Sequence, residues 1–81
     1  MKGVTMTKND FLRAYEAEVL KAYAWATDTD RRHKFMLSVR ATLRGPATTW
    51  SFDGPATREA WRAIGGKGKP TLKALRALED A

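Results

Sequence analysis

The chain contains no cysteine, and His33 is the single histidine among its 81 residues. Without cysteine, neither a disulfide nor a Cys-based zinc site can stabilise the fold. A His-based metal site would need several carboxylates that the sequence does not gather. His33 also stands among Arg31, Arg32 and Lys34, which would repel a cation. We therefore expect no bound metal and no cofactor.

Long apolar segments are absent as well. No apolar run approaches the ~20 residues that a membrane-spanning helix needs. The first ten residues, MKGVTMTKND, lack the apolar core of a signal peptide. We therefore expect a soluble, cytoplasmic protein with no membrane partner.

Recognisable catalytic groups are also missing. Ser38 and Ser51 have no base or nucleophile-elbow motif around them. The carboxylates are interpreted as helix caps and surface charge. Catalysis needs a base or nucleophile with a tuned pKa, and the sequence offers no candidate. We expect a binding protein rather than an enzyme.

What the chain does contain is enough for one small domain. Its 81 residues leave room for a single domain over 1–81. Apolar residues make up 43%, and three Trp, three Phe and two Tyr supply bulky side chains for a core. This composition argues against disorder.

Positive charge dominates the second part of the chain. The net charge is +6, yet residues 1–30 carry a balance of −1. Residues 31–81 hold eleven Lys or Arg against four acids, a balance of +7. Such asymmetry suggests a polyanionic partner, either nucleic acid or an acidic protein surface. A surplus of charge that serves only solubility is the alternative.

The first predicted helix spans residues 7–27. Thr7 can cap it, with Asp10 three residues later in a capping-box arrangement. Met6 and Phe11 occupy the two positions of a hydrophobic staple. The apolar stripe of this helix consists of Phe11, Tyr15, Val19, Ala22 and Ala26, widened by Leu12, Leu20 and Tyr23. A stripe at helical spacing indicates core packing.

The next segment allows two interpretations. Asp28 and Asp30 can cap a helix over 29–44 that buries Met36, Val39 and Leu43. The same region alternates apolar and polar residues from Leu37 onward, so a β-hairpin over 37–52 is the alternative. We favour the helix because Arg, Lys, Met, Leu and Ala dominate.

Two shorter helices complete the predicted fold. Pro55 opens a helix over 55–64 that turns Trp61 and Ile64 inward, and Gly65 ends it. Pro70 opens the last helix, over 70–80, whose apolar side carries Leu72, Leu75 and Leu78. The prediction is therefore an all-α bundle of about four helices at 7–27, 29–44, 55–64 and 70–80.

The stretch IGGKGKPTLKAL, residues 64–75, resembles the helix-hairpin-helix family of DNA-binding motifs. The hairpin of that family runs apolar-x-Gly-apolar-Gly and binds a DNA phosphate through its backbone and the start of the second helix. The resemblance implies that Gly66 and Gly68 are the hairpin glycines. It also implies phosphate contacts by Lys69, Thr71 and Lys73. The chain departs from the family at Lys67, where the family has an apolar residue.

The same stretch favours anion binding on physical grounds alone. Glycines let successive N–H groups converge on an anion, and Lys67 and Lys69 add full charges. The alternative is an ordinary flexible connector. The neighbouring helices favour phosphate binding because they carry further cations, namely Arg58, Arg62, Lys73 and Arg76. Trp50 is either part of the core or a stacking surface for a base or a partner side chain.

Two functions fit these features. The first is a small nucleic-acid-binding protein, acting on DNA in the first instance, that contacts phosphates with little base specificity. The second is a small interaction or inhibitor protein that docks on an acidic surface, for example on a host nucleic-acid enzyme or defence complex. The compact, basic, cysteine-free chain resembles many small phage or prophage products, which include both classes. The oligomeric state is open.

Overall fold

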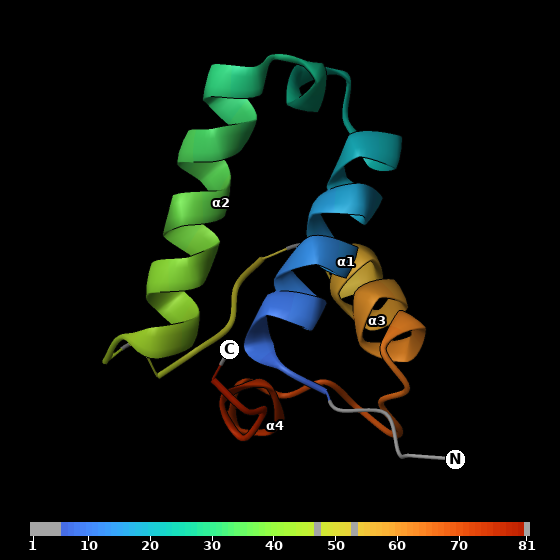
Figure 1. The fold of residues 1–81 in the computed structure, drawn as a ribbon, viewed down its shortest axis with the longest axis vertical. Coiled ribbons are helices and arrows are strands. Elements are labelled where there is room, and N and C mark those ends of the chain that lie inside the picture. The colour runs from blue at the N-terminus through green and yellow to red at the C-terminus, as the bar shows by residue number, and fades with distance from the viewer. Residues whose placement is uncertain (1–5, 47, 53, 81) are drawn as a thin grey trace.

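Two long helices, α1 (Lys8–Ala22) and α2 (Thr29–Arg44), are joined at one end by the 3-10 helix η1 (Ala24–Thr27) (Figure 1). The computed structural model describes residues 6–46, 48–52 and 54–80. It also contains α3 (Gly54–Ala63), which packs on α1, and the short α4 (Leu72–Arg76). The predicted small all-helical fold is confirmed. Residues 37–44 lie in α2 and the described part of the chain has no strand, which excludes the hairpin over 37–52.

The start of α1 is fixed by local hydrogen bonds, as the capping-box pattern predicts. The Thr7 Oγ1 atom accepts a hydrogen bond from the Asp10 N–H at 3.0 Å. In return, Asp10 Oδ2 accepts from the Thr7 N–H at 3.2 Å. Two N–H groups that have no partner inside the helix are thereby satisfied.

The predicted end of the first helix, at residue 27, is wrong. α1 stops at Ala22 because Tyr23 is extended, with φ −131° and ψ 126°. This break lets the rings of Tyr23 and Trp25 stack with centroids 5.7 Å apart. It also brings Trp25 edge-on to Phe35 of α2 at 5.2 Å. Residues 24–27 therefore form the 3-10 helix η1 in place of a last α-helical turn, and Trp25 within it packs on α2.

The apolar stripe of α1 is narrower than its spacing predicts. Phe11, Tyr15 and Val19 are fully buried, and Leu12 is nearly so. Ala22 is exposed, however, and Leu20 keeps 41% of its surface accessible. The prediction treated every apolar residue of α1 as buried. The fold instead leaves the side of α1 that carries Leu20 exposed to solvent.

Residues from all the helices close one core. α2 begins as predicted, with Asp28 Oδ1 accepting from the Arg31 N–H at 3.2 Å. The fully or nearly buried apolar residues outside α1 are Ala26, Met36, Val39, Leu43, Ala56, Ala60, Trp61, Leu75 and Leu78. Aromatic rings from the loop that follows α2 pack at the edge of this core.

The last helix is shorter than predicted, spanning Leu72–Arg76 rather than 70–80. Thr71, not Pro70, marks its start, and its hydroxyl accepts from the Ala74 N–H at 3.1 Å. Beyond α4, Glu79 forms a parallel bridge with Thr7. The Lys8 N–H donates to the Glu79 carbonyl at 2.8 Å, so this carbonyl bonds to the start of α1 and not within a longer α4.

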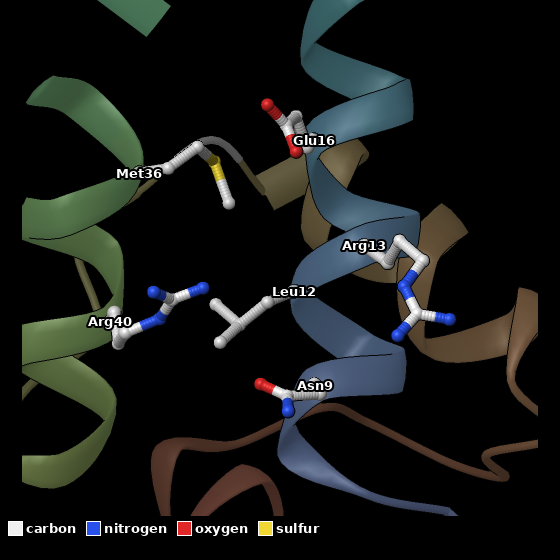
Figure 2. Close-up of a pocket in the computed structure, with 6 residues that line it drawn as sticks. All are labelled: Asn9, Leu12, Arg13, Glu16, Met36 and Arg40. Carbon is white, nitrogen blue, oxygen red and sulfur yellow. The ribbon is translucent and has the colours of Figure 1, made fainter. Parts of the chain in front are cut away.

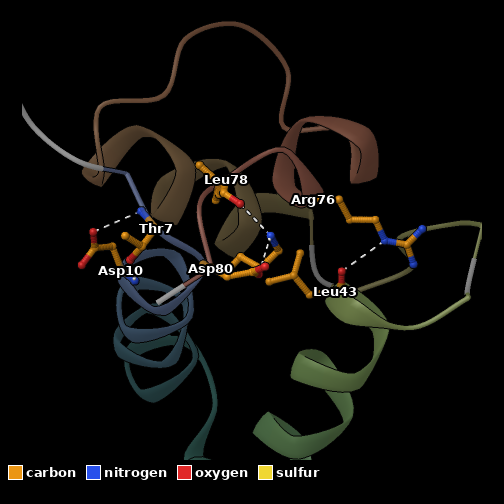
Figure 3. A network of polar contacts seen from close by, with 7 residues as sticks. Thr7, Asp10, Leu43, Arg76, Leu78 and Asp80 are labelled. Atoms are coloured by element: carbon orange, nitrogen blue, oxygen red, sulfur yellow. Dashed lines mark hydrogen bonds and ion pairs between the residues drawn. The ribbon is translucent and has the colours of Figure 1, made fainter.

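The Lys8 side chain strengthens the same junction. This side chain is almost buried, and its Nζ donates to the Leu78 carbonyl at 2.6 Å and pairs with Asp80 at 2.9 Å. Figure 3 shows Leu78 and Asp80 together beside the start of α1. The first and last described segments are thus held side by side. Among the described helices, none is long and apolar enough to cross a membrane.

Candidate nucleic-acid interface

The loop between α3 and α4 begins as the end of α3. Gly65, with φ +93°, donates its N–H to the Arg62 carbonyl at 3.0 Å. Gly66 donates to the Trp61 carbonyl at 2.8 Å. These two bonds form a Schellman motif, in which a glycine with positive φ ends the helix. Gly65 therefore ends α3 as predicted, and the N–H of Gly66 is already used by the helix.

The next part of the loop folds back over Trp61. The indole ring lies against Gly66, where a β-carbon would overlap it. The Trp61 Nε1–H also donates to the Lys67 carbonyl at 3.2 Å. Trp61 is 8% exposed, in agreement with its predicted core position. Residues 65–67 of the loop are thus bonded to α3.

The remaining loop residues present free backbone donors. The N–H groups of Lys67, Gly68 and Lys69 have no acceptor among the described residues. Gly68 has φ +76°, and no atom lies within 4 Å of the position of a β-carbon there. Lys67 and Lys69 are both exposed. The part of the loop with the geometry to meet an anion is therefore 67–69 rather than a span that starts at Gly66.

Beside this loop lies a cavity of about 230 Å³. It brings together two separate stretches of the chain: the loop after α2 with the first turns of α3, and the residues that precede α4. Its lining consists of Trp50, Phe52, Gly54, Thr57, Arg58, Lys69, Pro70 and Thr71. Three of the sequence-predicted contacts, Arg58, Lys69 and Thr71, thus share one site with Trp50.

Trp50 is held firmly at the wall of this cavity. Its Nε1–H donates to Thr57 Oγ1 at 2.9 Å. The ring packs edge-on against Phe11 and Tyr15, with centroids 6.0 and 6.2 Å apart, and against Phe52 at 4.9 Å. Trp50 remains half-buried. The two interpretations of Trp50 are compatible, because one part of the ring packs on the core while the ring also lines the cavity.

The cations around the cavity differ in how free they are. Arg58 and Lys69 are exposed and have no ion-pair partner in the described part of the chain. Arg62 is exposed but pairs with Glu59, its Nη1 lying 3.1 Å from the Glu59 carboxylate. Lys73 is exposed on α4 and does not line the cavity.

Arg76 has a different position from the other predicted contacts. Its guanidinium lies at the C-terminus of α2, where Nε donates to the Leu43 carbonyl at 3.1 Å (Figure 3). Its Nη2 donates to the carbonyls of Thr42 and Gly45 at 2.9 and 2.6 Å. Carbonyls at the C-terminus of a helix lack an N–H donor within the helix, so the guanidinium supplies the missing donors. Its positive charge also complements the helix dipole. Arg76 is therefore a cap of α2.

A second positively charged region lies between α1 and α2, and no pattern in the sequence predicts it. A cavity of about 310 Å³ there is lined by Asn9, Leu12, Arg13, Glu16, Met36 and Arg40 (Figure 2). Arg40 extends toward Leu12 in this view. Only the packing of α1 against α2 brings these residues together, so no local motif could have indicated the region.

A third cavity, of about 490 Å³, lies near the end of α2. It is lined by Lys8, Leu43, Arg44, Arg76 and Asp80. Lys8 is paired with Asp80 and Arg76 is bonded to carbonyls, while the charge of Arg44 also acts on Asp80 and lowers its pKa. These contacts join the start of α1 and the end of α2 to the last described segment of the chain.

No group of three or more His, Cys, Asp or Glu side chains within the described ranges could hold a metal ion. Comparisons with protein-family models, curated proteins and solved structures find no match to this chain.

Proposed function

We propose that this chain is a cytoplasmic nucleic-acid-binding protein without enzymatic activity. In this proposal the 67–69 loop and Arg58 contact phosphates, while Trp50 stacks on an unpaired base. The observation that carries the proposal is the shared cavity, in which an aromatic ring and two free cations, Arg58 and Lys69, meet. A half-exposed aromatic ring beside cations is the combination that binds single-stranded nucleic acid.

The cavity also supports low base specificity. Base-edge recognition relies on carboxylate, amide or forked guanidinium groups that are aimed at the base. The described lining contains no carboxylate and no amide side chain, and its one guanidinium, of Arg58, contacts a phosphate in this proposal. A stacked base contributes about 1–3 kcal/mol whatever its identity. We therefore expect binding that depends on strand state and salt more than on sequence.

Anisotropy titrations with a labelled oligonucleotide test this function. A mixed-sequence single strand of DNA and its duplex are titrated at two salt concentrations. The single strand should bind more tightly, and Trp50→Leu should remove about tenfold of that affinity, the equivalent of one stacked base. Arg58→Ala and Lys69→Ala should weaken binding of both forms. Lys34→Ala is the matched control, since Lys34 is exposed on α2 and lines none of the cavities described above.

Two results would contradict the proposal. One is a parent protein that binds neither form, or binds only at low salt. The other is an equal effect of Lys34→Ala and the cavity variants, which would reduce the interaction to net charge. Either result would leave the acidic protein surface as the better partner for these cations.

A further inference from the structure

Two adjoining cavities form a groove between α1 and α2. A second cavity of about 230 Å³ adjoins the first and shares Glu16, Met36 and Arg40 with it. Its other lining residues are Thr29, Arg32, His33 and Leu37. The two cavities together follow α2 from Thr29 to Arg40 and α1 from Asn9 to Glu16. None of their lining residues belongs to the Trp50 cavity.

The exposed large hydrophobic side chains of the described chain belong to these two helices. They are Leu20 on α1 and Leu37 on α2, with 41% and 48% of their surfaces accessible. Leu37 lines the groove directly. Leu20 lies one turn beyond Glu16, and residues four apart share a helix face. The floor between the helices is also apolar, because Leu12 and Met36 line it.

The charges around the groove are not balanced. Glu16 is its one acidic residue among the described lining, and Glu16 is paired with Arg32 at 3.0 Å. Arg13 on α1 and Arg40 on α2 have no acidic partner among the described residues. The Arg40 guanidinium extends into the space between the helices, near the exposed Leu37, whereas that of Arg13 lies at the outer edge of the groove and points away from α2 (Figure 2).

We propose that this groove binds an acidic amphipathic helix of a partner protein. An amphipathic helix places apolar side chains in a groove at spacings of three and four residues. Leu37 and Leu20 would contact those side chains, while Arg13 and Arg40 would pair with carboxylates along the flanks. Nucleic acid fits less well, because the described lining contains no Trp, Tyr or Phe ring to stack on a base, and its one imidazole, of His33, lies at the end of the groove away from Arg13.

A second copy of the chain is a poorer occupant than an acidic helix. In a symmetric contact each groove would meet the same groove, which would set arginines against arginines. An acidic partner avoids this repulsion and neutralises both cations. The proposal is independent of nucleic-acid binding, since it concerns another surface.

A synthetic peptide serves as the probe. It is a labelled amphipathic helix with leucines on one face and glutamates elsewhere. One control peptide has the same composition with scrambled leucines, and another has lysines in place of glutamates. Anisotropy titrations at physiological salt should show binding of the first peptide and much weaker binding of both controls.

Variants then locate the contact. Arg40→Glu should weaken peptide binding by about tenfold or more, because it reverses a rim charge. Leu37→Ser should weaken peptide binding several-fold. The protein should stay folded, because the Leu37 side chain is exposed. Lys34→Glu makes the same charge change at a residue of α2 that lines neither cavity, and it should weaken binding less than Arg40→Glu does. Melting curves verify that each variant is folded.

Several results would overturn the proposal. They are no binding of the parent to the acidic peptide, equal binding of the scrambled peptide, or equal losses for Arg40→Glu and Lys34→Glu. If Arg40→Glu instead abolished oligonucleotide binding, the groove would belong to the nucleic-acid surface. If the parent were a dimer and Leu37→Ser made it a monomer, the occupant would be a second copy.

Discussion

The indole ring of Trp61 occupies the space that a side chain on Gly66 would need. Gly66→Ala should therefore force the ring or the loop to move, at a cost of about 1–3 kcal/mol in the free energy of unfolding. Gly68→Ala is the matched control, because the space around position 68 is open. Its φ of +76° should cost only about 1 kcal/mol. Denaturant titration measures both, and equal losses would contradict the role assigned to Trp61.

Trp61 itself should be a main contributor to stability. Trp61→Ala removes a ring that is 8% exposed, together with the hydrogen bond from its Nε1–H to the Lys67 carbonyl. We expect a loss of about 3–5 kcal/mol in the free energy of unfolding. An unchanged melting temperature would contradict this core position and would make Trp61 a candidate for binding a partner.

Arg76 should affect stability rather than nucleic-acid binding. Arg76→Met keeps much of the stem but removes every donor to the carbonyls of Leu43, Thr42 and Gly45. The expected loss is about 1.5–3 kcal/mol, the range for hydrogen bonds to a charged group. Oligonucleotide affinity, measured where both proteins are folded, should stay close to that of the parent. A large loss of affinity at full stability would return Arg76 to the binding surface.

The pairing of Lys8 with Asp80 should make stability depend on acid pH. The hydrogen bond and positive charge of Lys8 lower the pKa of Asp80 from its ordinary value of 3.8. A carboxyl with a lowered folded-state pKa stabilises the fold while it is ionised. That contribution is complete above the unfolded pKa and is lost as the pH falls through the lower, folded pKa.

The variant Asp80→Asn tests this dependence. It should melt below the parent at neutral pH, and the difference should shrink as the pH falls below 3.8 and through the lower, folded-state pKa of Asp80. Glu79→Gln is the control, since Glu79 forms no ion pair within the described residues. A melting difference for Asp80→Asn that stays the same from neutral to acid pH would show that the ionisation of Asp80 does not contribute to stability.

Helix starts could be predicted from sequence because capping is local. Thr7 with Asp10, and Asp28 with Arg31, lie three residues apart, so each pattern is visible in a short window. The ends of α1 and α4 could not be predicted in this way. They depend on Tyr23 and Trp25 packing near α2, and on Glu79 pairing with the start of α1. These interactions join segments whose approach no local periodicity reveals.

The candidate site was predictable to the same limited extent. Composition indicated the Gly/Lys loop, and the structure places Lys69 beside Arg58 and Trp50. The glycines of this loop have different roles, which the sequence does not show. Gly66 lies against the Trp61 ring and bonds to the end of α3, whereas Gly68 has open space around it. The α1–α2 groove is less visible still. Its walls come from two helices whose exposed leucines look like core residues in the sequence.

The two lysines of the loop between α3 and α4 can be tested by substitution. If residues 67–69 bind phosphate, Lys67→Ala and Lys69→Ala should each weaken DNA binding by a similar factor whatever the sequence. The log–log dependence of affinity on salt should become shallower by about one unit for each phosphate that a variant no longer neutralises. Both side chains are exposed, so the melting temperature should not change.

Gly68→Val separates backbone geometry from charge. A β-branched residue resists the φ of +76° and blocks close approach of a phosphate to the loop N–H groups. We expect weaker binding with the fold retained, because no described atom lies near that position. The salt dependence should keep its slope, since the variant retains every cation. If Gly68→Val and both lysine variants bind as tightly as the parent, the loop is only a connector, and its lysines keep it solvated.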